Sequence, residues 1–368
     1  MNTPFRYDYV GSFLRPAALK QARTDFQNGA IDAEALKAVE DEAIRDLVAK
    51  QKAAGYHVIT DGEFRRATWH LDFMWGFNGV GHSPTKTGLP FHGEAAMLDD
   101  TYLTGKVSLD SHPFVEHFKF VKALEDENTV AKLTIPAPAQ FIEQMIMPFA
   151  LENTRKYYAD NRELAEDIAA GYRKFIADVY AAGCRNLQFD DCSWGMLVDS
   201  RAKEFFGTDE AGLEKIKEQL LRINNLAIEG KPDDLTIATH VCRGNFHSTY
   251  ASSGAYDAVA QTLLARENVD AFYLEFDDER SGGFKPLASI PDGKKVVLGL
   301  VTTKSPKLEN KSDLIGRVRS ASDYIPLDHI CLSPQCGFAS CEIGNKLTED
   351  EQWAKVALVK STAEDIWS

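Results

Sequence analysis

The sequence lacks the features of a membrane-spanning or secreted protein. Its first residues, MNTPFRYDYVGSF, show no basic start followed by an apolar run, and no stretch of about 18 apolar residues occurs anywhere. Cysteine is absent before Cys184, and the six cysteines all follow in the C-terminal half. A chain of 368 residues has no need of a disulfide framework. We therefore expect a cytoplasmic protein without a membrane partner, whose cysteines are buried or bind a metal.

The sequence also contains fewer positively charged residues than negatively charged ones. The 41 Lys+Arg residues stand against 55 Asp+Glu residues, which gives a formal net charge of −14. Because such a surface repels phosphates on average, we do not expect a nucleic-acid partner. No GxGxxG or GxxxxGK[ST] loop follows any expected strand, so nucleotide-dependent chemistry lacks its usual signature. The composition, 44% hydrophobic and 10% aromatic, is typical of a globular protein with a large core.

Short β-type runs alternate with helical stretches along the whole chain. The expected strands are 8–13, 57–62, 131–136, 186–191, 236–242, 271–276, 295–301 and about 325–332. Helices are expected at 34–54, up to Gly183, at 209–229, 255–267 and 310–322, and after a capping box formed by Thr348 and Glu351. Strands that alternate with helices pair in parallel, and eight such units close into a barrel.

The pattern therefore predicts an α/β fold, a (β/α)8 TIM barrel that occupies residues 1–368 as a single domain. The segment near 76–125 is rich in glycine and shows no helical period until about 115, which indicates an insertion placed to cover the barrel mouth. A doubly wound open sheet shows a similar alternation and remains the alternative.

The expected strands end in polar residues, which lie where a barrel of this kind has its active site. His240 and Cys242 close one run, and side chains two apart on a strand point to the same side. An imidazole and a thiolate suit zinc, and a tetrahedral site needs two more ligands. Glu275 and Cys336 end two other runs and are the candidates. The second His-x-Cys pair, His329 and Cys331, lies inside its run, so we expect it in the core.

Several separated motifs resemble, in order and spacing, the catalytic half of cobalamin-independent methionine synthase. They are Thr239-His240-Val241-Cys242, Glu275, Lys304-Ser305-Pro306, Pro334-Gln335-Cys336-Gly337, Val10-Gly11-Ser12-Phe13, Gly62-Glu63 and Gln188-Phe189-Asp190. The resemblance runs from about residue 8 to about 340 and is closer to the short, single-barrel members of the superfamily. It implies a (β/α)8 barrel that binds Zn²⁺ through His240, Cys242, Glu275 and Cys336.

The resemblance also implies an activity, that of a zinc-dependent S-methyltransferase in methionine biosynthesis. Its small-molecule substrates would be homocysteine and a methyl donor, a methyltetrahydrofolate or another methyl carrier. Glu63 and Asp190 would hold the amino group of the amino-acid substrate, and the Gly11-Ser12 segment would hold its carboxylate. Beyond the metal ligands, no catalytic residue is assigned.

Two departures from the family pattern concern the methyl donor. The family has a histidine, the proposed proton donor, immediately before its Ser-Pro, where this sequence has Lys304. The family also has a tryptophan after the segment that matches Thr134-Ile135-Pro136, where this sequence offers only Phe141. Three alternatives therefore stay open. They are alkyl transfer to another thiol, as in epoxyalkane:coenzyme M transferases, a non-catalytic barrel that binds zinc or a sulfur amino acid, and a metal-free decarboxylase.

Overall fold

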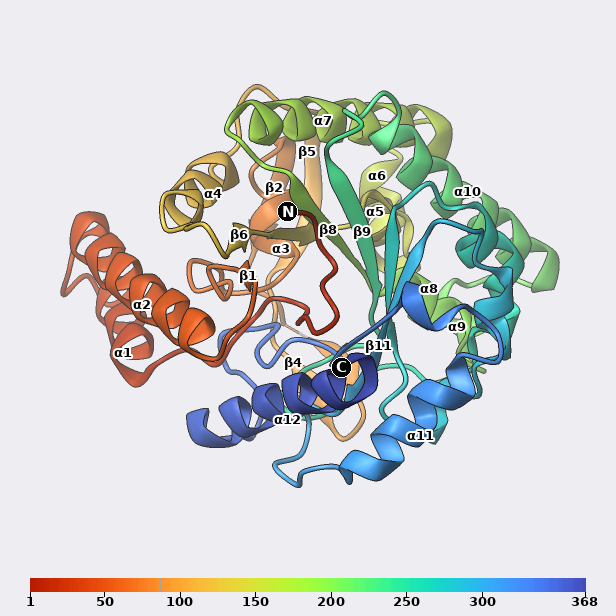
Figure 1. Cartoon of the computed structure of the whole chain (residues 1–368). Helices are drawn as coiled ribbons and strands as arrows, with labels where there is room; N and C mark the ends of the chain where they lie inside the picture. Colours follow the sequence, from red (N-terminus) through yellow and green to blue (C-terminus); the bar gives the residue numbers. More distant parts are fainter. Residues whose placement is uncertain (87) are drawn as a thin grey trace.

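Six parallel strands form the central sheet of the computed structural model, which describes residues 1–86 and 88–368 (Figure 1). Their order is β12-β11-β10-β9-β8-β7. The strands are β7 (Leu133–Pro136), β8 (Asn186–Asp191), β9 (Thr236–Val241), β10 (Ala271–Glu275), β11 (Lys295–Val301) and β12 (Ile330–Pro334). All their residues except Lys295 are buried, as expected of a parallel sheet covered by helices. The predicted α/β class is confirmed.

Further pairing flanks both edges of this sheet. β1 (Val58–Ile59) pairs in parallel with β6 (Val130–Ala131), and only Lys132 separates β6 from β7. At the other edge Tyr7 forms a parallel bridge with Leu332 of β12, whose carbonyl accepts a hydrogen bond from the Asp8 N–H at 3.0 Å. Closure of all eight segments into a barrel remains a prediction.

The prediction of a strand over residues 8–13 is wrong, and side chains explain why. The carbonyl of Val10 accepts a hydrogen bond from the Gln188 amide at 2.9 Å, and that of Gly11 accepts one from the Thr60 hydroxyl at 2.7 Å. The Lys132 ammonium likewise donates a hydrogen bond to the carbonyl of Tyr9. Since these side chains occupy acceptors that a strand partner would use, residues 8–13 form no ladder.

Helices alternate with the strands as the sequence predicts (Figure 1). They are α1 (Ala17–Gln27), α2 (Ala33–Ala53), α3 (Leu71–Met74), α4 (Phe114–Lys122), α5 (Pro138–Ile146), α6 (Pro148–Thr154), α7 (Asn161–Ala181), α8 (Ser193–Leu197), α9 (Ala202–Phe205), α10 (Glu210–Ile228), α11 (Lys311–Ala321) and α12 (Glu349–Trp367). Gly183 follows α7 at φ +97°, and the Thr348–Glu351 capping box opens α12. In place of a regular α-helix over 255–267, the chain forms short 3-10 and π turns at Tyr256–Ala258 and Ala260–Leu264. Other short 3-10 turns are Glu279–Ser281, Lys285–Ser289 and Leu327–His329.

The predicted insertion folds into two antiparallel pairs followed by α4. β2 (Asn78–Ser83) pairs with β5 (Asp100–Ser108), and β3 (Leu89–Phe91) pairs with β4 (Glu94–Ala96). The β3–β4 hairpin packs on the loop that follows β9. The rings of Phe91 and Phe246 lie 5.2 Å apart, and His92 stacks on Tyr250 at 5.1 Å. The hairpin therefore covers a loop at the carboxyl edge of the sheet.

The hydrophobic core fills the space between the sheet and its helices. A second, smaller cluster consists of Ala238, Ala271, Tyr273, Val297 and Cys331. Cys331 is thus a core residue, as predicted, but His329 ends the 3-10 turn Leu327–His329 and is only partly buried, so the prediction is wrong for it. Within the described residues, no helix combines the length and the apolar character that crossing a bilayer requires.

Candidate metal centre

Four side chains from three segments that lie far apart in the sequence meet at the carboxyl edge of the sheet. His240 is in β9, Cys242 follows that strand directly, Glu275 ends β10 and Cys336 lies two residues after β12. One ligand atom from each of the four side chains lies within 4.8 Å of the other three, and all four residues are buried. The structure therefore brings together the residues that the sequence nominated as metal ligands.

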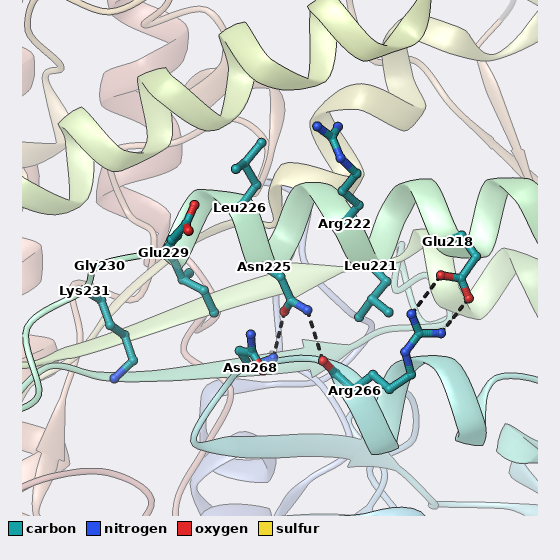
Figure 2. A pocket seen from close by; sticks show the side chains of 11 residues that line it. Glu218, Leu221, Arg222, Asn225, Leu226, Glu229, Gly230, Lys231, Arg266 and Asn268 are labelled. Carbon is teal, nitrogen blue, oxygen red and sulfur yellow. Dashed lines mark hydrogen bonds and ion pairs between the residues drawn. The ribbon is translucent and has the colours of Figure 1, made fainter.

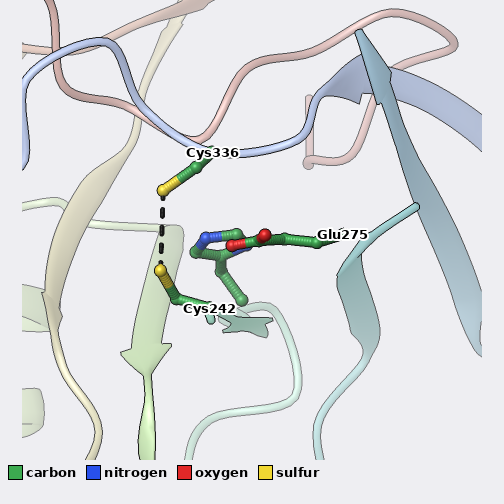
Figure 3. Close-up of side chains that lie close together, drawn as sticks. Cys242, Glu275 and Cys336 are labelled. Atoms are coloured by element: carbon green, nitrogen blue, oxygen red, sulfur yellow. Dashed lines mark hydrogen bonds between the residues drawn. The ribbon is translucent and has the colours of Figure 1, made fainter. Parts of the chain in front are cut away.

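The spacing of these atoms fits a tetrahedral zinc site. The Sγ atoms of Cys242 and Cys336 lie 3.7 Å apart, and the Glu275 carboxylate points toward them (Figure 3). Two sulfur atoms about 2.3 Å from one zinc ion, at the tetrahedral angle, are about 3.8 Å apart. Both ring nitrogens of His240 and the Oε2 atom of Glu275 are buried without a hydrogen-bond partner in the described structure. A buried polar atom left unpaired costs about 1–3 kcal/mol, and a metal ion would satisfy the Glu275 oxygen and one of the two His240 nitrogens.

The backbone around the cluster is held by hydrogen bonds to neighbouring strands and loops. The Cys242 N–H donates to the Asp191 carbonyl at 3.0 Å. Glu275 is fixed twice, because its N–H donates to the Tyr256 hydroxyl and its Oε1 accepts from the Arg243 N–H, both at 2.9 Å. These contacts leave only Oε2 of Glu275 free to bind a cation.

A third thiol, that of Cys192, lies beside the cluster and was missed in the sequence. The register pairs Asp191 with Val241, so the next residues, Cys192 and Cys242, are neighbours across β8 and β9. Hydrogen bonding with Cys192 raises the pKa of the Cys242 thiol well above its usual range, and hydrogen bonding with Cys242 does the same for Cys336. Aligning the ends of the two predicted strands would have revealed this neighbour.

Glu63 lies in a tight turn between β1 and α3. Its φ of +63° is uncommon for a residue other than glycine and is often found at functional sites. Its Oε1 accepts a hydrogen bond from the Thr134 hydroxyl at 2.8 Å and lies 3.4 Å from the Arg66 guanidinium, while Oε2 is buried and unpaired in the described structure. One oxygen of Glu63 is thus available to a buried hydrogen-bond donor.

Asp190 is the second predicted carboxylate of the substrate site. It is the register partner of the candidate ligand His240, and its Oδ1 accepts a hydrogen bond from the Gln188 amide at 2.7 Å. Burial raises the pKa of both Glu63 and Asp190 to about 7, and the charge of Asp190 contributes to the shift of Glu63. The charge of Asp190 therefore acts on Glu63, and Asp190 itself lies beside the metal cluster.

The Gly11-Ser12 segment lies between Thr134 and the loop that carries Cys336. A Cβ atom on Gly11, whose φ is +149°, would come within 2.7 Å of the Thr134 side chain. The Ser12 hydroxyl accepts a hydrogen bond from the Ala339 N–H at 3.3 Å, and the Ser12 carbonyl accepts one from the Phe338 N–H at 3.0 Å. The four predicted substrate residues are thus linked to the metal cluster by β7, β8 and the Cys336 loop.

The two residues that depart from the family pattern, Phe141 and Lys304, lie in different surroundings. Phe141 is fully buried and packs edge-on against Phe77, with ring centres 5.2 Å apart, so it presents no ring to the site. Lys304 has a buried Nζ without a hydrogen-bond partner in the described structure, and the charges of Glu275, Asp277 and Cys336 attract it. The chain therefore lacks the aromatic ring that the family tryptophan supplies at the position of Phe141. At the position of the family histidine it has the cation Lys304.

A surface hollow of about 620 Å³ lies away from this cluster (Figure 2). Its lining includes Asn225, Lys231 and Asn268, which come from the end of α10 and from the segments that precede β9 and β10. Arg266 and Glu218 form a bidentate ion pair, with N–O distances of 2.6 and 2.9 Å, along one side of the hollow. The hollow is therefore at the amino edge of the sheet, opposite the candidate ligands.

Comparison with known proteins gives one consistent result. Residues 150–360 match the family model for the catalytic domain of cobalamin-independent synthase. YxjH, an uncharacterized protein from Bacillus subtilis, is 42% identical over 365 residues, which cover 99% of this chain and 95% of YxjH.

Two solved structures are similar over nearly their whole length. One, from Listeria monocytogenes and provisionally described as a vitamin-B12-independent methionine synthase, has a TM-score of 0.78 and 35% identity, covering 100% of this chain and 99% of that one. The other, a B12-independent methionine synthase from Shewanella sp. W3-18-1 in complex with selenomethionine, has a TM-score of 0.71 and 20% identity, covering 98% and 97%. The second likeness concerns the fold alone.

Proposed function

Because this chain belongs to the cobalamin-independent methionine synthase family, we propose that it is a zinc-dependent methyltransferase that converts homocysteine to methionine with a methyltetrahydrofolate as donor. Membership of the family supports the methyltransferase class. The zinc ion, the thiol and the donor are our proposal.

The observation that carries the proposal is the cluster of His240, Cys242, Glu275 and Cys336. A free thiol is mostly protonated at neutral pH because its pKa is near 8.5, and a bound Zn²⁺ ion supplies the deprotonation that makes it nucleophilic. Two cysteinates and one carboxylate bring three negative charges to the site, which keeps the substrate sulfur electron-rich. Glu275, which would be the oxygen ligand, would be the residue to give up its place to that sulfur.

Glu63 and Asp190 are suited to an ammonium group. Glu63 has a buried oxygen without a partner in the described structure, and Asp190 is the register partner of the candidate ligand His240. The backbone of Gly11 and Ser12, beside the Cys336 loop, would hold the carboxylate of the same amino acid.

The pairing at both edges of the sheet supports a closed barrel of eight segments in one domain, 1–368. The β1–β6 pair extends the sheet beyond β7, and the Tyr7–Leu332 bridge extends it beyond β12. The Phe13 N–H donates to the Gly62 carbonyl at 3.2 Å, which joins the two extensions.

A turnover assay tests the function. Zinc-replete protein is incubated with homocysteine and 5-methyltetrahydropteroyltriglutamate, and methionine is measured by mass spectrometry. We expect methionine from the normal protein and none from the Cys336→Ser variant. Thiol binding without methionine would assign a different donor, and the absence of both thiol binding and methionine would overturn the proposal.

A further inference from the structure

Two polar atoms without partners belong to residues at the carboxyl ends of neighbouring strands, because Glu275 ends β10 and Lys304 follows β11. The Oε2 atom of Glu275 and the Nζ atom of Lys304 are both inaccessible to solvent, and in the described structure neither has a hydrogen-bond partner. No ion pair within 4.0 Å joins Lys304 to any described carboxylate. Leaving a charged atom buried and unpaired is costly, so this arrangement calls for a state in which both atoms are satisfied.

The electrostatics of Lys304 connect it to the metal cluster. Burial lowers the pKa of the lysine, but the attraction of Glu275, Asp277 and Cys336 outweighs burial and raises it. Glu275 is the strongest of these attractions. Lys304 is therefore a cation, and the Glu275 carboxylate is the anion that attracts it most strongly.

The backbone of Lys304 is fixed to the loop that carries Cys336. The neighbouring Thr303 donates from its N–H to the Gln335 side chain at 2.6 Å and from its hydroxyl to the Gly337 carbonyl at 3.0 Å. Asn345 donates to the Thr303 carbonyl at 2.8 Å. These bonds fix the backbone beside Lys304 to the Cys336 loop, so movement of the side chains rather than of this backbone would bring Lys304 to Glu275.

We propose that Lys304 is a positioning residue that receives the Glu275 carboxylate when the substrate thiolate takes the place of that carboxylate at the metal. This inference rests on the proposed function. Glu275 would hold the metal through Oε2 and would give up that place to the substrate sulfur, whose thiol proton would pass to solvent. Glu275 would then be an unpaired anion inside the protein, and the Lys304 ammonium would pair with it while keeping all its protons.

The test is a thiol titration of the Co²⁺-loaded protein, followed by the cobalt absorption bands, which respond to ligand exchange independently of turnover. Lys304→Met keeps the length of the side chain and removes its charge. We expect it to bind cobalt as well as the normal protein but to need at least about tenfold more homocysteine for half of the spectral change, since a hydrogen bond between charged groups is worth about that factor. Lys307→Met is the matched control, because Lys307 is exposed on the same loop, and it should titrate like the normal protein.

The Glu275→Gln background separates this role from others. With no carboxylate to receive, the additional change Lys304→Met should have no further effect on the thiol titration at saturating cobalt. An unchanged midpoint in Lys304→Met alone, or an effect that persists in the Glu275→Gln background, would overturn the assignment and indicate that the lysine contacts the substrates instead. A normal protein whose cobalt spectrum does not respond to homocysteine would instead overturn the proposed function itself.

Discussion

The Sγ atoms of Cys242 and Cys336 lie 3.7 Å apart, although 94 residues of chain separate them. Cys242 follows β9 and Cys336 follows β12, and β10 and β11 lie between those strands in the sheet. In a flat sheet, strands in these positions would be about 14 Å apart. The contact therefore requires the carboxyl edge of the sheet to curve inward, and this curvature is what assembles the ligand cluster.

Loss of Cys336 should abolish tight metal binding. Removing a group that only orients a metal ligand costs about 10- to 100-fold in affinity, so Cys336→Ser, which removes a ligand, should cost more than about 100-fold. Competition with a zinc-sensitive chelator measures the effect. Cys331→Ala is the control, because Cys331 is equally buried but lies in the apolar cluster with Tyr273 and Val297. Equal zinc affinity of the two variants would exclude the cluster as the metal site.

Binding of an amino-acid thiol should strengthen as the pH rises through about 7. Burial raises the pKa of Glu63 and of Asp190 to about 7, and only the ionised carboxylates attract an ammonium group. Isothermal calorimetry with homocysteine, and with a thiol of the same length that lacks the amino group, measures the difference. Both thiols lose a proton at the metal and therefore bind more tightly as the pH rises, but the dependence should be steeper through about pH 7 for homocysteine, which alone has an ammonium group. An identical profile for both thiols would contradict the assignment of the two carboxylates.

The same shifts should make the protein less stable as the pH rises. A carboxyl whose pKa is higher in the folded state binds its proton more tightly there, so its stabilisation is complete below its ordinary pKa of 4.5 and is lost as the pH rises through about 7. Urea denaturation across this range should show a smaller pH dependence of the free energy of unfolding for Glu63→Gln than for the normal protein. A profile unaltered by the substitution would show that Glu63 titrates normally.

Gly337→Ala should impair substrate binding without unfolding the protein. A Cβ atom at this position would lie 1.9 Å from the Ser12 hydroxyl oxygen, so Ser12 must move. A displacement of about 1 Å in a binding site can cost up to about 100-fold, and we expect the KM for homocysteine to rise by about 10- to 100-fold. Gly316→Ala has open space around its Cβ and should leave the KM unchanged. Equal KM values for the two variants would remove Ser12 from the substrate site.

Thr348→Ala should destabilise the C-terminal helix α12. The Thr348 hydroxyl accepts a hydrogen bond from the Glu351 N–H, and the Glu351 side chain accepts one from the Thr348 N–H. These two backbone N–H groups at the start of the helix have no carbonyl partner within it and depend on this pair. Loss of an N-cap typically costs about 1 kcal/mol in the free energy of unfolding. Thermal denaturation checks this, with Ser361→Ala inside the same helix as the control. A loss no greater than in that control would show that the capping box does not contribute.

The sequence predicted elements whose signal is local and missed those that depend on distant partners. The strands 186–191 and 295–301 were predicted to the residue, because Leu187 and Phe189 alternate with polar residues in the first and the second is an apolar run. Residues 8–13 have the same β-type pattern, but Lys132 and Gln188, more than a hundred residues away, occupy the carbonyls that a strand needs.

The same limit applies to the site. The four candidate ligands could be nominated because each ends an expected strand, and parallel strands end at one edge. Cys192 and the buried state of Phe141 depend on register and on packing across α5 and α7, which one-dimensional patterns do not encode. The Lys304–Glu275 relationship likewise appears only when the two loops are seen together.

X-ray absorption at the zinc edge, measured before and after addition of homocysteine, tests the central claim most directly. The account predicts two sulfur ligands, one nitrogen and one oxygen in the first spectrum, and three sulfur ligands with loss of the oxygen in the second. A ligand set that stays the same at saturating homocysteine would mean that the site is closed to an external thiol, and would contradict the account.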